Sequence, residues 1–65
     1  MIYSNLKAEM VLRRISIEEL AKKMLISRFS LEKKLNGDKD FNLYEIEIIL
    51  KTFNGCEFEY LFQLK

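Results

Sequence analysis

Residues 16–37 read SIEELAKKMLISRFSLEKKLNG, and this stretch decides the fold. It opens with a capping box, because the Ser16 side chain can accept a hydrogen bond from the Glu19 amide while the Glu19 side chain reaches back. Apolar side chains follow at helical spacing and would form one face of a helix. The pattern therefore predicts a helix over residues 17–24.

A second helix follows after a turn of three residues. Ser27 is suited to cap its start, and Gly37 can take the left-handed backbone conformation in which many helices end. Leu31 and Leu35 lie four apart, as two residues on one buried helical face do. We expect this helix over residues 28–36.

Similar marks divide the rest of the chain. Asn42 and Glu45 form a second capping box, Ser4 is a suitable cap for a first helix, and Asn54-Gly55 is a suitable helix end. Residues 44–48 alternate apolar and polar types as a strand would, but the cap before them and the length of the segment favour a helix. The remaining helices are expected over residues 5–13, 43–53 and 57–62.

The expected fold is all-α, with one domain over residues 1–65 built as a compact bundle of five short helices. A chain of this length buries only about 60% of its unfolded surface, so its core is small. The side chains expected to fill that core are Ala21, Met24, Ile26, Leu31 and Leu35, the stripe Leu43, Ile46, Ile49, Leu50 and Phe53, and the capping residues Phe58 and Leu61.

The composition excludes several classes of function. Cys56 is the single cysteine and the chain has no histidine, so an intrachain disulfide is impossible and a zinc site lacks ligands. Asp38-Lys39-Asp40 lacks the ligand spacing of a calcium loop. No serine or cysteine stands beside a base. We expect a protein that is not an enzyme, with no metal, no cofactor and no small-molecule ligand.

The N-terminal residues do not form a signal peptide, because polar residues interrupt the first apolar positions. Apolar runs such as residues 48–50 are far shorter than the roughly 20 residues that cross a bilayer. A single unpaired thiol suits a reducing compartment. We expect a cytoplasmic protein with no membrane partner.

Charge is distributed unevenly along the chain. Residues 1–35 hold eight Lys/Arg against four Glu, a net +4, whereas residues 36–65 hold three lysines against six acidic residues, a net −3. Together they give the overall charge of +1. Such asymmetry indicates a basic face for a polyanion and an acidic end that faces elsewhere. Two solvated helical surfaces would have the same composition, and this alternative stays open.

Two short helices joined by so tight a turn are typical of the helix-turn-helix, in which the second helix enters the major groove of DNA. The unit would span about residues 16–36. With Leu31 and Leu35 turned inward, a rotation of about 100° per residue defines an outward stripe on the second helix. That stripe holds Phe29, Glu32, Lys33 and Asn36.

Further residues match one family of such proteins. They are Ser16, Leu20-Ala21, Ile26-Ser27, Leu31, Asn36-Gly37, the spacing Phe41-x-Leu43-x-x-Ile46, and Tyr60-Leu61-Phe62. On these residues the chain resembles the lambda-repressor/Cro-like (XRE-type) family, mostly phage and plasmid regulators, over nearly its whole length. The chain departs from the family at three positions. Leu25 stands where the family often has glycine, and Ile17 and Arg28 stand where it often has glutamine.

The resemblance implies sequence-specific binding of double-stranded DNA by a small prokaryotic or phage regulator, a Cro-like repressor that occupies an operator. Base contacts are expected from the helix over 28–36. Arg28 and Lys33 are suited to guanine O6/N7, and Phe29 is suited to a thymine methyl group. Glu32 is suited to cytosine N4. Contacts to the DNA backbone are expected from Ile17 (through helix-terminal amides), Lys22, Ser27, Lys34, Asn36 and Lys39.

The chain carries more apolar side chains near its C-terminus than one short helix can bury. A two-fold interface is expected to use Tyr44, Ile48, Tyr60, Phe62 and Leu64. Such a homodimer would place two recognition helices about one DNA turn apart, on a palindromic operator. The alternative, in which these residues complete a monomeric core, stays open.

A different function on the same fold also stays open. Phe29 could pack under the turn or meet a protein, and Arg28 could pair with Glu32 four residues on. An exposed Phe29, Glu32, Ile17 in place of a polar residue, and the low net charge favour a protein-interaction module without DNA binding, or an antitoxin component. The uneven charge and the basic residues Arg28, Lys33 and Lys39 favour DNA.

Overall fold

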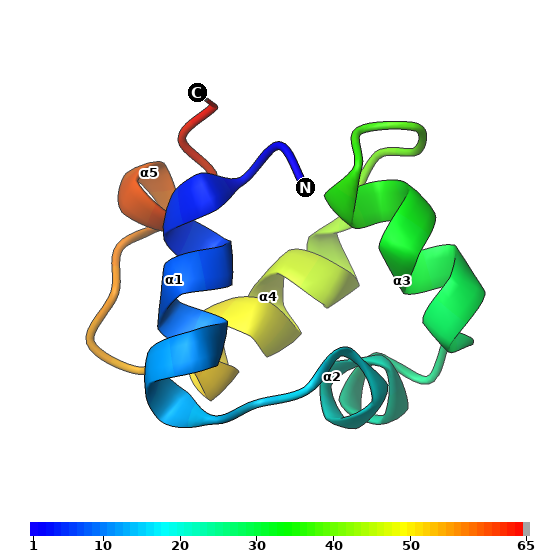
Figure 1. The fold of residues 1–65 in the computed structure, drawn as a ribbon, viewed down its shortest axis with the longest axis horizontal. Helices are drawn as coiled ribbons and strands as arrows, with labels where there is room; N and C mark the ends of the chain where they lie inside the picture. Colours follow the sequence, from blue (N-terminus) through cyan, green and yellow to red (C-terminus); the bar gives the residue numbers. More distant parts are fainter. Residues whose placement is uncertain (65) are drawn as a thin grey trace.

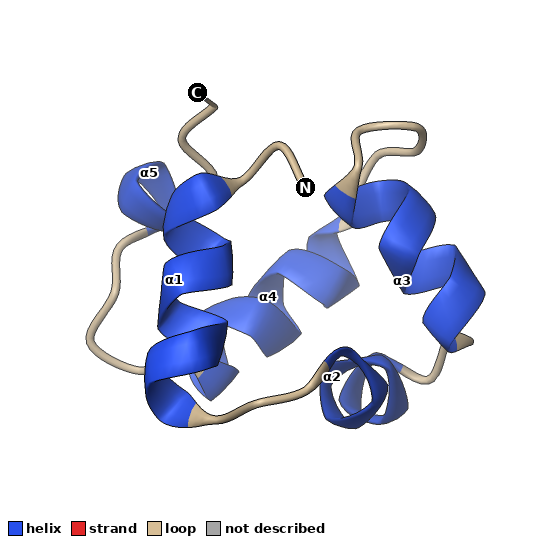
Figure 2. Cartoon of the chain, viewed as in Figure 1, coloured by secondary structure: helices blue, strands red, loops and turns tan. Residues whose placement is uncertain are grey.

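All five expected helices form, each within one residue of its expected ends. The structure, a computed structural model, describes residues 1–64. Its elements are α1 (Ser4–Arg13), α2 (Ile17–Met24), α3 (Arg28–Leu35), α4 (Leu43–Thr52) and α5 (Phe58–Leu61) (Figures 1 and 2). The described residues contain no strand, and the alternating segment 44–48 is helical within α4. The expected all-α class is confirmed.

The predicted caps start three of the helices. The Ser16 hydroxyl accepts from the Glu19 amide at 3.1 Å, and the Glu19 carboxylate accepts from the Ser16 amide at 2.9 Å. The Asn42–Glu45 box closes in the same way, at 2.8 and 3.0 Å. The Ser27 hydroxyl accepts from the amide three residues on at 3.1 Å. These caps satisfy amides that would otherwise have no partner within the helix.

The expected cap of α1 was wrong. Ser4 is the first helical residue rather than the cap, and Tyr3 precedes it without a side-chain capping bond. The entry of the chain is fixed by tertiary contacts instead. The Ile2 amide donates to the Leu35 carbonyl at 3.0 Å, and the Tyr3 ring packs against Phe41 and Phe62. The start of α1 is thus fixed by contacts with distant residues, whereas α2, α3 and α4 start at local side-chain caps.

Four residues take left-handed backbone conformations at or after helix ends. Gly37 and Gly55 have φ of 86° and 94°, as their positions predict. Arg14 and Leu25 have φ of 57° and 60°, although neither is a glycine. At Leu25 the amide donates to the Lys22 carbonyl at 3.2 Å, and the following amide donates to the Ala21 carbonyl at 3.1 Å. This pattern ends α2 and turns the chain toward α3.

The core is small and mostly as expected. It contains Leu6, Met10, Leu20, Ala21, Met24, Leu31, Leu35, Ile49, Phe53 and Leu61. Ile26 and Leu50 are half-buried against it. Two expectations were wrong, because Leu43 is 81% exposed and Phe58 is 45% exposed. The buried face of α4 runs through Glu45 and Ile49 and continues at Phe53, which caps its end, whereas Leu43, its first residue, lies off that face. Phe58 packs on the Phe62 ring, with centroids 5.0 Å apart.

The helices surround this core with α2 in contact with both α3 and α4, and α1 in contact with α5. Figure 1 shows α1 and α5 on one side, α3 on the other and α4 crossing behind them. The Asn5 side-chain amide donates to the Tyr60 carbonyl at 2.9 Å and so ties α1 to α5. No described helix has the length and apolar character needed to cross a membrane.

Candidate nucleic-acid interface

The outer face of α3 presents two neighbouring pairs of side chains in contact. Ser27 caps the helix, so Arg28 and Phe29 lie in its first turn. Each contacts the residue four positions later, Arg28 with Glu32 and Phe29 with Lys33. The four residues expected to contact bases therefore form one continuous surface, because residues four apart lie on the same side of a helix.

Arg28 is held by carboxylates from two helices. Its Nε donates to Glu32 of α3 at 3.1 Å, and its Nη1 donates to Glu18 of α2 at 3.4 Å. The hydrogen bond to Glu32 contributes most to raising the pKa of Arg28 above its ordinary value. The side chain is nevertheless 56% exposed. The guanidinium thus has a defined position over the junction of α2 and α3 and remains accessible from outside.

Phe29 points outward rather than under the turn. Its exposed fraction is 66%, which is unusual for a large aromatic residue. The Lys33 ammonium lies 5.1 Å from the centre of the ring, in the range of a cation–π contact. The face of α3 therefore presents an aromatic ring and an ammonium group in contact with each other.

The candidate backbone contacts occupy the edges of α2 and α3. Ile17 is half-buried against the core, so only the amides of the α2 N-terminus are available to a phosphate. Lys22, Asn36 and Lys39 are exposed. The Ser27 hydroxyl is engaged with Ser30, accepting from its amide and donating to its Oγ.

Two depressions gather half of the ten candidate DNA contacts. One, of about 320 Å³, is lined by Glu18, Ala21, Lys22, Ile26 and Arg28, so Lys22 shares a concavity with the candidate base contact. The other, of about 290 Å³, is lined by Met1, Lys7, Ile17, Glu32, Leu35 and Asn36. Lys39 lines neither of them. The expected surface therefore runs from α2 across α3 and reaches α1.

Lys34 is not available for the phosphate contact that was expected of it. Its ammonium binds the Glu45 carboxylate of α4, and the two side chains are only 13% and 4% exposed. Moving the ammonium to a phosphate would leave Glu45 charged and unpaired in the interior, which is costly. We therefore remove Lys34 from the expected DNA contacts.

The expected subunit interface divides into exposed and packed residues. Tyr44, Tyr60 and Leu64 are 50%, 40% and 61% exposed. Ile48 and Phe62 are half-buried against the core. The Tyr60 hydroxyl donates to Glu9 at 3.1 Å, and this hydrogen bond raises the pKa of Tyr60. The exposed part of the expected interface is therefore smaller and more polar than the sequence indicated.

Sequence reasoning missed three residues of this region. Glu18 was given no role at this site, yet its carboxylate accepts a hydrogen bond from Arg28, ten residues later. Lys7 shares a depression with Ile17 across a helix boundary. Glu45 was recognised as a cap but not as the buried partner of Lys34. Each of these three arrangements arises from the packing of two helices. The spacing of residues within one helix could not have revealed them.

The described residues contain no group of three potential metal ligands. Comparison of the chain with protein-family models, curated proteins and solved structures finds no significant match.

Proposed function

We propose that α2 and α3 form a helix-turn-helix, and that the protein is a small transcriptional regulator that binds specific sequences of double-stranded DNA. The observation that carries this proposal is the outer face of α3, where Arg28 and Phe29 are exposed and each contacts the residue four positions later, Arg28 with Glu32 and Phe29 with the half-buried Lys33. The tight connection through Leu25, whose left-handed conformation ends α2, supports it.

In this proposal α3 enters the major groove with its N-terminal turn toward the bases. Arg28 donates two hydrogen bonds to guanine O6 and N7, and Glu32 keeps the guanidinium oriented from behind or accepts from cytosine N4. Phe29 contacts a thymine methyl group, with Lys33 beside it. The carboxylates of Glu18 and Glu32 repel phosphate at every sequence alike, so discrimination between sites depends on the base contacts of α3.

Contacts to the DNA backbone position the helix in this proposal. The amides at the N-terminus of α2, beginning at Ile17, and the Ser27 end of α3 bind phosphate oxygens. Lys22, Asn36 and Lys39 add side-chain contacts. These groups carry no sequence information, but they set the register in which α3 meets the bases.

We further propose a homodimer on a palindromic operator. Tyr44 on α4, Tyr60 on α5 and Leu64 supply exposed apolar surface outside α3. A two-fold pair would place its α3 helices about 34 Å apart, one turn of DNA. Occupying an operator in this way is sufficient for repression of the Cro type in a bacterium or phage.

The second candidate is a protein-interaction module or antitoxin component on the same fold. The observation that favours it is the pairing of Arg28 with two carboxylates beside an exposed Phe29. A face balanced in charge and carrying an exposed aromatic ring suits a protein surface. The two candidates differ in their response to salt, since phosphate contacts make binding strongly salt-dependent.

Selection of bound sites from a random duplex library tests the proposal. We expect enrichment of one sequence with two-fold symmetry, bound with an affinity that falls steeply between about 50 and 200 mM salt. Arg28→Ala should weaken binding to the selected site at least tenfold and change binding to random DNA little. Lys51→Ala, at an exposed lysine of α4, is the matched control. An absence of duplex binding at about 50 mM salt would reject DNA binding.

A further inference from the structure

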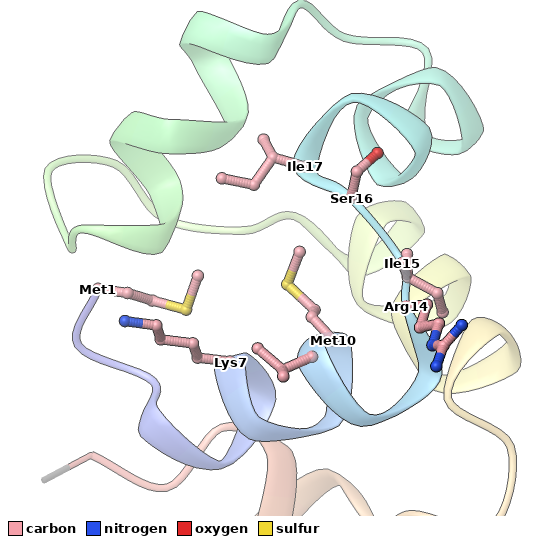
Figure 3. Close-up of a pocket in the computed structure, with 8 residues that line it drawn as sticks. Met1, Lys7, Met10, Arg14, Ile15, Ser16 and Ile17 are labelled. Carbon is pink, nitrogen blue, oxygen red and sulfur yellow. The ribbon is translucent and has the colours of Figure 1, made fainter.

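An apolar groove lies between α1 and the start of α2, outside the face of α3. Its volume is about 400 Å³, and Figure 3 shows the side chains around it. We call it the α1–α2 groove, and its lining residues are Met1, Lys7, Met10, Val11, Arg14, Ile15, Ser16 and Ile17. Three segments contribute to it, namely the N-terminal residues, α1 and the α1–α2 connection.

The groove is open, and much of its apolar surface remains accessible. The side chains of Met1 and Met10 point toward Ile17 across it in Figure 3. Val11 is 70% exposed and Met1 is 40% exposed, and no described segment covers them. Methionines adapt their shape to an incoming surface. A hollowed apolar patch of this kind marks an interaction site more often than the scattered apolar residues found on every surface.

The charges around the groove are all of one sign. Lys7 and Arg14 line it, and no acidic residue does. Neither forms an ion pair within residues 1–64, in contrast to Arg13, which pairs with Glu9. Lys7 lies on α1, and Arg14 is the left-handed residue that follows its end. The two cations stand on opposite sides of the apolar lining in Figure 3, so the groove offers apolar contacts flanked by positive charge.

We propose that the α1–α2 groove binds an acidic amphipathic helix of a partner protein. Such a helix would place apolar side chains three and four residues apart into the groove and carboxylates beside them, toward Lys7 and Arg14. Duplex DNA does not explain the groove, because an apolar lining contributes nothing to phosphate binding. A second copy of this chain would dock head to tail, and such contacts tend to propagate rather than close.

Occupancy of the groove would oppose DNA binding, and this part of the inference rests on the proposed function. The groove shares Met1, Lys7 and Ile17 with the depression that continues to Glu32 and Asn36 of α3. A helix seated in the groove would therefore lie beside the expected DNA contacts and add carboxylates there. The partner would act as an inhibitor of the regulator.

The probe is a labelled synthetic helical peptide of about 14 residues, with leucines three and four apart and a glutamate on each side of the leucine stripe. Fluorescence anisotropy at low salt measures its affinity for the full chain, without DNA. A peptide with glutamine in place of both glutamates tests the charges. We expect micromolar binding of the acidic peptide and at least tenfold weaker binding of the glutamine peptide.

Variants of the protein locate the site. Val11→Asp and the double change Lys7→Gln/Arg14→Gln should each weaken peptide binding at least tenfold. Leu43→Asp is the matched control for the first, because Leu43 is another exposed apolar residue, on α4. Lys51→Gln is the control for the second. Both controls should bind the peptide as the unchanged protein does, and thermal unfolding confirms that each variant is folded.

Several outcomes would overturn the proposal. Equal binding of the acidic and glutamine peptides, or unchanged binding by both groove variants, would do so. Self-association that Val11→Asp abolishes would identify a second copy as the occupant. Loss of duplex affinity in the double variant, with no peptide binding, would assign the groove to DNA. Peptide binding by a protein that binds no duplex would uphold the groove and reject the proposed function instead.

Discussion

The helices α2 and α4 begin with the same type of capping box, yet the glutamate of the first box is exposed and the glutamate of the second is buried. Glu19 of α2 is exposed. Glu45 of α4 is 3% exposed. Its Oε1 accepts from the Asn42 amide, while its Oε2 accepts from Lys34 of α3. The same local signature therefore makes one ordinary helix cap and one buried connection between helices.

A cap motif therefore determines where a helix begins, whereas its position in the fold determines how much its side chains contribute to the free energy of unfolding. A buried ion pair is costly to dehydrate and is not in itself strong evidence of stability. Here it joins the last turn of α3 to the first turn of α4, while the main packing of α3 is on α2. We infer that the Lys34–Glu45 pair fixes the orientation of α3, on which the proposed DNA contact depends.

Replacing Glu45 with alanine should have the largest effect. The change leaves the Lys34 ammonium buried without a partner and the Asn42 amide without its acceptor, so we expect a loss of about 3–5 kcal/mol in the free energy of unfolding. Glu19→Ala removes the equivalent residue of the exposed box and should cost far less. Urea unfolding of both variants measures the contrast, and equal losses would contradict it.

A paired change separates the charge from the cap. Glu45→Gln retains a capping side chain, since glutamine serves in a capping box, and Lys34→Met fills similar space without charge. We expect each single variant to be destabilised and the double variant to recover most of the loss, because two buried charges then disappear together. Lys33→Met is the control for Lys34→Met. Additive losses would show that the two side chains are not coupled.

The C-terminal end of α2 offers a smaller, stabilising change. Leu25 has φ of 60° and is 80% exposed, so its side chain is strained and contributes little packing. Leu25→Gly relieves the strain but adds freedom to the unfolded chain, and we expect a net gain of about 0.5–1 kcal/mol. Leu43→Gly, at an equally exposed leucine in helical conformation, should instead lose about 0.5–1 kcal/mol. Thermal unfolding distinguishes the two signs.

Most of the fold was predictable because its boundaries are local. The boxes at Ser16 and Asn42, the serine at 27 and the two glycines each determine a helix end through bonds within a few residues. The same rules predicted a wrong cap at Ser4. There, a hydrogen bond from the Ile2 amide to the last residue of α3 determines how the chain enters α1. Local chemistry identifies helix ends until a distant contact replaces it.

The candidate site was predictable only in part. Helical rotation correctly put Phe29 on the outside of α3 and Leu31 on the inside. It could not reveal that Glu18 would reach Arg28, or that Lys34 would turn inward to Glu45. Both contacts depend on how two helices pack, and that information is absent from the spacing within either one.

The smallest expected effect is the response of the exposed box to acid. Hydrogen bonds from the Ser16 amide and hydroxyl lower the pKa of Glu19 from its usual 4.5. A carboxylate with a lowered pKa in the folded state stabilises the protein above the unfolded value, and this contribution is lost as pH falls through the folded value. Glu19→Gln keeps the capping geometry without the charge, so its stability should differ from that of the unchanged protein above about pH 4.5 and converge below it.

Nuclear magnetic resonance titration of the Glu19 carboxyl carbon tests this cause directly. Ser16→Ala removes the hydroxyl, so the pKa of Glu19 should rise toward 4.5 in that variant. The hydrogen bond from the amide of residue 16 to the Glu19 carboxylate remains, so the pKa of Glu19 should not rise fully to 4.5. A Glu19 pKa at or above 4.5 in the unchanged protein would contradict the formed box in solution. In that case the exposed Ser16–Glu19 box would not form in solution, and only the Asn42–Glu45 box would stabilise its helix.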